Sequence, residues 1–253
     1  MSEDMSIESY LAKGGVLSNP HNVPPRYRAE LLKLMTSFVD SELAGAAGFA
    51  DIINFGPGIK SRIAAAKIVL EKTDHADMVL KVMAEFGVDA ERYANHHPWT
   101  ARLDRDAAIG TKRVQQDMRL AVFNYPLTTW ADAVVMNLLM GRAVGVQLAD
   151  FQMVSYQPLA EVFRAITPVE ARHAELAEEG LAKLLEDDSN RDAIQASVLY
   201  WWPRVAASFG SGASDKADTL KALGIRKSTN AELKTRWEGE ASEILKKLGL
   251  AIG

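Results

Sequence analysis

Residues 59–87 read IKSRIAAAKIVLEKTDHADMVLKVMAEFG, and this stretch decides the fold. It follows a loop, NFGPG at 54–58, and it carries apolar residues at helical rather than alternating spacing. Gly87 stands where a glycine commonly closes a helix, because glycine tolerates the left-handed backbone needed there. We therefore predict one long helix over about 59–87, with His75 near its middle and Lys72 one turn before it.

The same periodicity extends in both directions from this helix. Residues 1–25 contain GG, SNP and VPP and are predicted to form an N-terminal arm, followed by one helical domain over 26–253. No alternating strand pattern is long enough to count, so the chain is predicted to be all-α, a bundle of long antiparallel helices with accessory ones. The other predicted helices cover about 26–50, a charged connector up to about 119, a mostly buried segment from an N-cap at Thr128 or Thr129 to about 153, 158–186 with an interruption at Pro168, a segment holding 193–210, and the pair 216–223 and 230–248.

Composition excludes several classes of function. The 253 residues carry a net charge of −4, which offers no electrostatic reason to bind nucleic acid or an anionic membrane. Cysteine is absent, so thiol catalysis and thiolate metal sites are excluded and only His and carboxylates remain as ligands. The polar N-terminus is no signal peptide, and the longest apolar run is too short to span a bilayer. We expect a cytoplasmic protein.

One pair of residues has metal-ligand spacing. Glu170 and His173 are three residues apart, so both side chains lie on one helix face. Carboxylate-bridged bundles use this Glu-x-x-His pair on two helices and a single Glu on each of the other two, a donor set suited to iron or manganese. Glu42 and His75 fit two further positions. An alternative is structural: TPVE at 167–170 also fits a capping box, in which Glu170 bonds to the backbone.

Lys72 occupies the position where the partner of His75 should be a glutamate. An ammonium has three donors and no acceptor, so it cannot ligate a metal while protonated. Among buried carboxylates it would instead supply the positive charge that a metal otherwise provides. Glu71 points about 100° away from position 72 and would need a π-bulge to turn inward. We therefore interpret Lys72 as a substitute for a cation.

Longer motifs are more specific than this spacing. DSELAG (40–45), AKIVLEKTDH (66–75), VFNYPLTTWADA (122–133), SYQPLAEVFRAI (155–166) followed by EARH, YWWPRVAASFG (200–210) and STNAELKTRW (228–237) occur in this order. Together they resemble the catalytic (A) subunit family of ring-1,2-phenylacetyl-CoA epoxidases of phenylacetic acid degradation. The resemblance implies a ferritin-like four-helix bundle and membership of a multicomponent monooxygenase, which uses a di-iron centre, O₂ and electrons from a reductase.

Carried over by position, the family's ligands are incomplete here. The ligand positions implied by the resemblance are Glu42, Lys72, His75, Gly141, Glu170 and His173, of which Lys72 and Gly141 replace acidic residues. Any remaining metal would be held by Glu42, His75, Glu170 and His173. We expect a divergent paralogue with a degenerate, metal-free site and no cofactor; iron is expected only if the site is active. The family's catalytic subunits also continue beyond LGLAIG with an extension used in assembly, so the same set of partners is not assured.

Three functions stay open at this point. The first is a non-catalytic scaffold, acyl-CoA binder or partner of a metal-bearing subunit. The second is an active O₂-dependent acyl-CoA monooxygenase with a mononuclear or rearranged di-iron site, and the third is an unrelated helical binding protein. The family resemblance favours a homodimer or a hetero-oligomer with a related ferritin-like subunit. For the phosphates of an acyl-CoA, the candidates are Arg102, Arg105, Lys112 and Arg113, although a solvated connector explains the same charges.

Overall fold

The computed structural model describes residues 6–112, 117–210 and 216–252. Within these ranges the chain forms α-helices and short 3₁₀ turns, and its only β-type pairing is an isolated bridge between Leu17 and Tyr156. The all-α prediction is confirmed. The helices are α1 (Ile7–Ala12), α2 (Pro25–Ile52), α3 (Ile59–Glu85), α4 (Ala90–His96), α5 (Trp130–Phe151), α6 (Gln157–Leu184), α7 (Arg191–Ala207), α8 (Ala217–Ala222) and α9 (Asn230–Lys247), and the 3₁₀ turns are η1 (Pro20–Asn22), η2 (Ile53–Phe55), η3 (Ala121–Asn124) and η4 (Asp188–Asn190).

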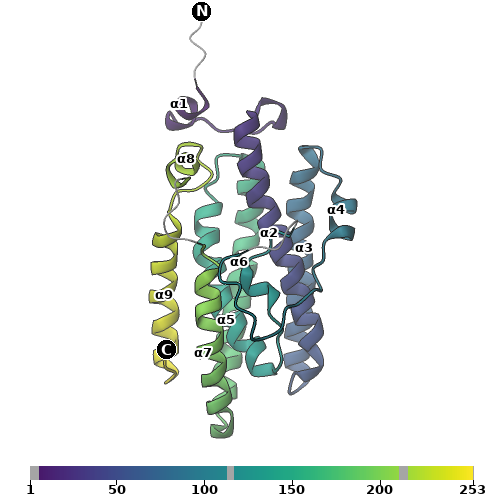
Figure 1. Cartoon of the computed structure of the whole chain (residues 1–253), viewed down its shortest axis with the longest axis vertical. Coiled ribbons are helices and arrows are strands. Elements are labelled where there is room, and N and C mark those ends of the chain that lie inside the picture. The colour runs from purple at the N-terminus through teal and green to yellow at the C-terminus, as the bar shows by residue number, and fades with distance from the viewer. Residues whose placement is uncertain (1–5, 113–116, 211–215, 253) are drawn as a thin grey trace, which may run out of the picture.

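Helices α2, α3, α5 and α6 form a four-helix bundle (Figure 1). The most extensive contacts are between α2 and α3 and between α5 and α6, and α3 also packs on α6. Helices α7 and α9 lie beside α5 on the other side of the molecule, and α8 lies above α9 in Figure 1. One apolar core fills the space among α2, α3 and α6, and a second lies among α5, α7 and α9. The middle of the bundle therefore receives side chains from α2, α3 and α6 at the same level.

The predicted helix ends are largely those observed. Helix α3 ends at Glu85, and Gly87 follows with φ +84°, the left-handed conformation that glycine adopts without strain. Helix α5 begins after Thr129, whose side chain accepts a hydrogen bond from the backbone N–H of Asp132. Of the two predicted N-caps, Thr129 is therefore the one used.

Pro168 does not interrupt its helix, so that prediction is wrong. Helix α6 runs without a break from Gln157 to Leu184 and contains Pro168 in its interior. Thr167 donates its hydroxyl to the carbonyl of Phe163, one turn back, and is not an N-cap. The capping-box alternative is therefore also wrong, and Glu170 is left to face the bundle core.

The charged connector is not helical beyond α4, contrary to the prediction. After His96 the chain follows an irregular path through residues 97–112 and 117–120. Pro98 disfavours a helical conformation at the residue before it. The carbonyls of this segment accept hydrogen bonds from arginine side chains instead: the buried Arg119 donates to Pro98 and Ala101, and the half-buried Arg102 donates to Trp99. In this segment, hydrogen bonds from side chains take the place of the backbone hydrogen bonds of a helix.

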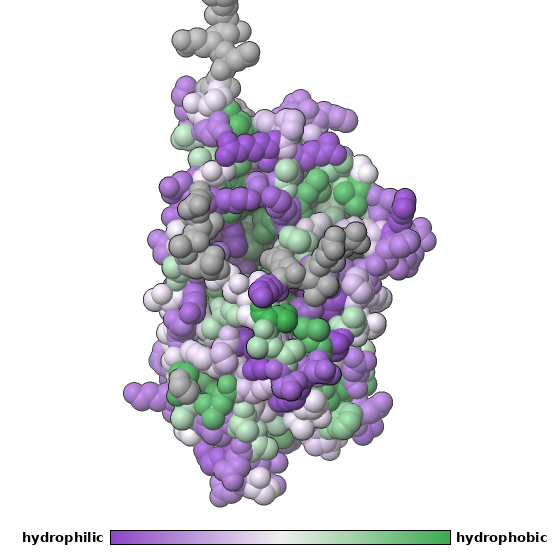
Figure 2. Space-filling view, in the orientation of Figure 1, coloured by the Kyte–Doolittle hydropathy of each residue, from purple (hydrophilic) through white to green (hydrophobic). Residues whose placement is uncertain are grey.

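One helix of the described part, α5, is long and apolar enough to cross a bilayer, but 78% of its apolar window is buried inside the bundle. The face seen in Figure 2 mixes hydrophilic and hydrophobic side chains, and apolar groups are recessed between polar ones in its upper half.

Candidate functional site

Lys72 lies at the centre of the bundle and joins three helices. Its Nζ is 3.2 Å from Oε1 of Glu42 on α2 and 2.9 Å from Oε1 of Glu170 on α6. All three residues are buried. A buried ammonium between two carboxylates satisfies charges that would each be costly alone. The interpretation of Lys72 as a cation between these two glutamates matches the geometry.

His75 lies one turn after Lys72 on the same face of α3. Its Nδ1 is 3.2 Å from Oε2 of Glu42 and 3.1 Å from Oε1 of Glu170. The carboxylates of Glu42 and Glu170 therefore each contact both the Lys72 ammonium and the His75 imidazole. Five of the six sequence-predicted positions meet here, because His173 on α6 also comes within 3.3 Å of Oε1 of Glu170, without the geometry of a hydrogen bond.

The electrostatics of the cluster favour two cations and two anions. Burial alone would lower the pKa of Lys72, but the charges of Glu170 and Glu42 outweigh it and raise that pKa above its usual range. Burial opposes the charging of His75 too, yet hydrogen bonds to Glu170 and Glu42 raise its pKa to about 9. Burial tends to raise the pKa of Glu170, but Lys72 and the two histidines hold it well below its ordinary value. Lys72, His75 and Glu170 are therefore all held in their charged forms.

Glu71 reaches the site without any distortion of its helix. Its Oε2 lies 2.6 Å from Nε2 of His173, and α3 is regular α-helix throughout this region. This contact needs no π-bulge, because His173 comes across from α6 to meet Glu71 at the rim of the cluster. A π-bulge was expected only for Glu71 to take the inward place of Lys72, which it does not occupy. The Glu71 side chain is still 24% exposed, so it connects the buried cluster to the protein surface.

Gly45 makes room for the lysine side chain. A Cβ atom at this position of α2 would lie 3.5 Å from Cδ of Lys72 and 3.2 Å from the ring of Phe123. The small residues of DSELAG thus allow the aliphatic part of Lys72 to lie against the α2 backbone. Phe123, from η3, covers the same spot from the other side.

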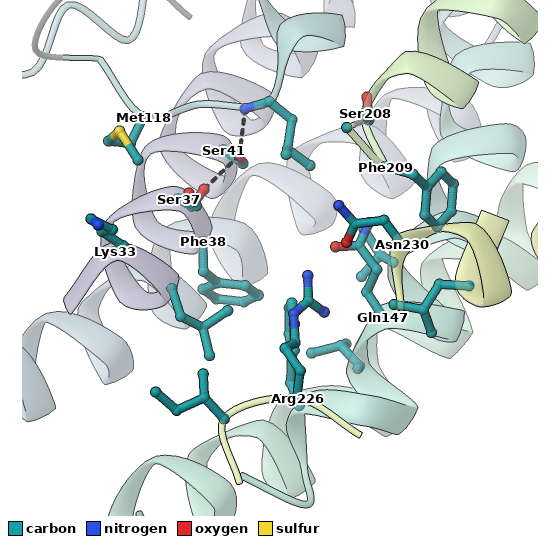
Figure 3. A pocket seen from close by; sticks show the side chains of 18 of the residues that line it. Lys33, Ser37, Phe38, Ser41, Met118, Gln147, Ser208, Phe209, Arg226 and Asn230 are labelled. Carbon is teal, nitrogen blue, oxygen red and sulfur yellow. Dashed lines mark hydrogen bonds between the residues drawn. The ribbon is translucent and has the colours of Figure 1, made fainter. Parts of the chain in front are cut away.

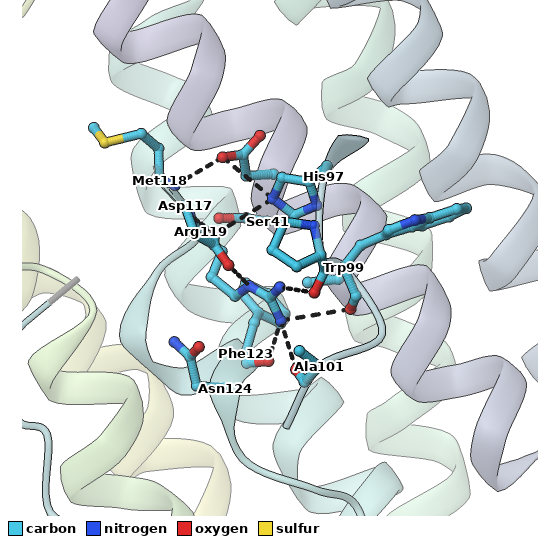
Figure 4. A network of polar contacts seen from close by, with 12 residues as sticks. Ser41, His97, Trp99, Ala101, Asp117, Met118, Arg119, Phe123 and Asn124 are labelled. Carbon is cyan, nitrogen blue, oxygen red and sulfur yellow. Dashed lines mark hydrogen bonds and ion pairs between the residues drawn. The ribbon is translucent and has the colours of Figure 1, made fainter. Parts of the chain in front are cut away.

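A second buried polar network holds the loop that carries Phe123 (Figure 4). Asp40 of α2 accepts hydrogen bonds from the hydroxyl of Tyr93, at 2.5 Å, and from the backbone N–H of Met118, at 2.7 Å. Asp117 accepts from the backbone N–H and Nε of Arg119, and Nε2 of His97 lies 3.3 Å from both aspartates. The sequence pattern did not predict this network, although Asp40 belongs to the quoted DSELAG stretch.

This second network also places one histidine and two carboxylates together, and their ligand atoms lie within 4.8 Å of one another. Their acceptor positions are filled by Tyr93, the backbone and Arg119, and the Arg119 guanidinium adds a positive charge beside Asp117. We therefore interpret the network as structural: it fastens residues 117–124 to α2.

Gly141 does not join the cluster. A Cβ at this position of α5 would lie 3.0 Å from Cβ and 3.2 Å from Cα of Ala174, so the position faces the backbone of α6. A carboxylate at 141 would first meet Ala174 and would need α5 and α6 to separate. The next acidic residue of α5, Asp150, does not replace the missing carboxylate, since it accepts hydrogen bonds from the backbone N–H groups of Lys227 and Ser228.

The candidate phosphate contacts are largely committed to structure. Arg102 donates to the carbonyls of Trp99, Ala101 and Ala44. Arg105 pairs with Asp132 at 2.7 Å and stacks over Tyr200 at 3.8 Å. Lys112 is exposed, and Arg113 lies outside the described residues. Arg102 and Arg105 are half-buried, and their contacts hold the fold together.

Comparison with known proteins places the chain. Residues 16–253 match the family model described as phenylacetic acid catabolic protein. The chain belongs to this family. The 1,2-phenylacetyl-CoA epoxidase component designated A from Escherichia coli (strain K12) is 22% identical over 257 residues, which cover 100% of this chain and 78% of that protein. A solved structure, protein 19 with aldehyde deformylating oxidase activity from Synechococcus, superposes with a TM-score of 0.61 at 15% identity, over 90% of this chain and 93% of that chain. The fold is therefore that of a ferritin-like bundle.

The residues of the Lys72 cluster do not supply the donor set that the family resemblance implies for a di-iron centre, because Lys72 and Gly141 stand at two of its six positions. Glu42, His75 and Glu170 bring ligand atoms within 4.8 Å of one another, which is compact enough for one ion. The Nζ of Lys72, however, lies within 3.4 Å of three carboxylate oxygens of Glu42 and Glu170, where a metal would compete with it. Two carboxylates that already neutralise an ammonium and an imidazolium offer little charge to a divalent cation.

Proposed function

We propose that this protein is a non-catalytic member of its family whose core is held by Lys72 instead of iron. The single observation that supports this most is the position of the Lys72 Nζ between Glu42 and Glu170. A protonated lysine there provides permanent charge compensation, so the bundle needs no metal to be stable. Catalysis by a di-iron centre has no place in this arrangement.

The proposed role is that of a scaffold or acyl-CoA binder in aromatic acyl-CoA catabolism, acting as the partner of a metal-bearing subunit. The family membership and the relative named as an epoxidase component support this role. We propose a homodimer or a hetero-oligomer with a related ferritin-like chain as the assembled form.

Elemental analysis of the purified protein tests the proposal. We expect wild-type protein, produced in iron-supplemented medium, to contain well under one iron or manganese per chain. Lys72→Glu should create a Glu-x-x-His pair with His75 and gain metal, seen as a rise of the thermal midpoint on addition of Mn²⁺. Lys67→Glu is the matched control, because Lys67 lies on the same helix with its side chain 57% exposed. Close to two irons per wild-type chain, lost in Glu170→Ala, would refute the proposal.

A second candidate is an O₂-dependent acyl-CoA monooxygenase with a mononuclear or rearranged site. The contact between Glu71 and His173 favours it, because it adds a carboxylate on the His173 imidazole at the rim of the cluster. This candidate requires about one metal per wild-type chain, lost in both His75→Ala and Glu71→Ala. A metal content that neither variant changes would exclude it.

A further inference from the structure

A cavity of about 350 Å³ lies between α2, α5 and the segment leading into α9 (Figure 3). Glu42 of the Lys72 cluster is one of its lining residues. Its volume falls at the lower end of the range of small-molecule sites, about 300–1,000 Å³. Most of its lining is apolar and includes Phe38, Phe123, Met140, Leu148 and Phe151. Such a cavity suits a ligand with a hydrocarbon chain or ring.

Two donors that line this cavity make no hydrogen bond within the described part of the chain. Nε2 of Gln147 on α5 is enclosed without an acceptor, and the residue is only 9% exposed. Nη1 of Arg226 is likewise enclosed, and it lies 3.9 Å from Oδ2 of Asp150, which is an ion-pair contact but beyond hydrogen-bond distance. Figure 3 shows both side chains pointing into the same part of the cavity. Because buried donors are almost always bonded, these two donors call for acceptors from outside the described chain, and a ligand or an ordered water can supply them.

The Arg226 guanidinium is held in place but its charge is poorly compensated. It stacks over the ring of Phe151 at 4.4 Å, and its side chain is 19% exposed. The nearest carboxylate, Asp150, is 3.9 Å away and is already bonded to the backbone N–H groups of Lys227 and Ser228. Burial lowers the pKa of Arg226 to about 10, with Asp150 opposing, so the group is a cation at neutral pH.

We propose that this cavity binds a small monocarboxylic acid as the free carboxylate. Arg226 and Gln147 donate hydrogen bonds to the carboxylate oxygens, and the apolar part of the acid extends along Phe38 toward Glu42. A guanidinium and an amide are suited to a planar anion with two acceptor oxygens. The end of the cavity near Glu42 needs no polar group from the ligand, because Lys72 and His75 already bind that carboxylate.

The same chemistry disfavours two other ligands. An acyl-CoA that entered this cavity by its acyl end would place an uncharged thioester carbonyl at Arg226, with its phosphates too far away to pair with that cation. A cationic or purely apolar ligand would leave both donors without an acceptor, at the cost of burying unsatisfied polar groups. The ligand is held by Arg226 and Gln147, so its binding does not depend on whether the Lys72 cluster holds a metal.

Titration calorimetry of the full chain with decanoate tests this site, with 1-decanol and decanoyl-CoA as comparison ligands. Decanoate should bind and should bind at least about tenfold more tightly than decanol, as expected for charge-assisted hydrogen bonds. Arg226→Gln should weaken decanoate binding about tenfold or more and leave decanol unchanged. Arg172→Gln is the matched control, because Arg172 is an exposed arginine of α6 that pairs with Glu175 and Glu179.

Two further variants guard against a merely structural effect. Gln147→Leu keeps the volume of the side chain and removes the amide, so it should weaken decanoate only. Val144→Phe should fill the cavity beside Met140 and weaken decanoate and decanol together, with the Arg226 site intact. The proposal would be overturned if decanoate did not bind detectably, if decanoate and decanol bound equally well, or if decanoyl-CoA bound more tightly than decanoate. It would also be overturned by an Arg226→Gln variant that folds and binds decanoate normally. Metal analysis of the same samples keeps this outcome separate from that of the proposed function.

Discussion

The Nζ of Lys72 lies 2.9 Å from Oε1 of Glu170, so a lysine of α3 is joined to a glutamate of α6 in the centre of the bundle. Glu42 completes the arrangement from α2. Burial of each of these three charged groups is tolerated only because the other two are present. Removing one of them should therefore lower the stability of the protein.

Lys72→Met should destabilise the fold strongly. The substitution leaves Glu42 and Glu170 buried with only His75 between them, and breaking a buried ion pair in this way costs about 3–5 kcal/mol. Urea unfolding at pH 7 measures the loss. Lys67→Met, which removes an exposed lysine 3.5 Å from Glu71, should cost less than about 1 kcal/mol. Equal effects of the two substitutions would contradict the buried network.

The stability of the protein should decrease as the pH rises from about 6.5 to about 9. The folded-state pKa of His75 is raised to about 9 from its ordinary value of 6.5. The native state therefore holds the extra proton, and its stabilisation is complete below pH 6.5 and is lost as the pH passes 9. The slope contributed by one such group is about −1.4 kcal/mol per pH unit. Urea unfolding of wild type and His75→Gln over this range should show that the slope is reduced in the variant.

Asp40→Asn should loosen the loop that carries Phe123. Asp40 accepts from Tyr93 and from the backbone of Met118, and hydrogen bonds to a charged group are worth about 1.5–3 kcal/mol. Hydrogen exchange should become faster at the Met118 amide, and the free energy of unfolding should fall. Asp77→Asn is the control, since Asp77 is 58% exposed and pairs only with Lys81, at 2.6 Å, among the ion pairs of the described residues. Unchanged exchange at Met118 would show that the loop does not depend on Asp40.

Gly141→Ala and Gly145→Ala, both on α5, should have opposite effects. The new Cβ at 141 would lie 3.0 Å from that of Ala174, and overpacking of this kind costs about 1–3 kcal/mol. At 145 no atom of the described residues outside the local helix lies within 4 Å of the added Cβ, so alanine should stabilise the helix by up to about 1 kcal/mol. Thermal denaturation of both variants checks this. A stabilising Gly141→Ala would mean that α5 and α6 are less closely packed than the structure shows.

Much of the fold follows from periodicity. The long helices, the N-cap at Thr129 and the closing Gly87 were all predictable, because local patterns and backbone preferences decide them. The behaviour of Pro168 was not, since packing of α6 against its neighbouring helices outweighs the local cost of a proline inside a helix. The irregular path of residues 97–112 also depends on distant partners, notably Arg119.

The sequence by itself determined that Lys72 shares a helix face with His75, and Glu170 with His173, because helical spacing fixes which residues share a face. That Glu42 joins them was implied by the resemblance of the longer motifs to the epoxidase family. Only the tertiary structure decided how they pair. It placed Lys72 between two carboxylates, brought Glu71 to His173, and turned Gly141 toward Ala174. It also enclosed Arg226 and Gln147 in one cavity, although they are far apart in the chain. The physical reason is that spacing along a helix sets direction, whereas the distance between charges depends on how the helices pack.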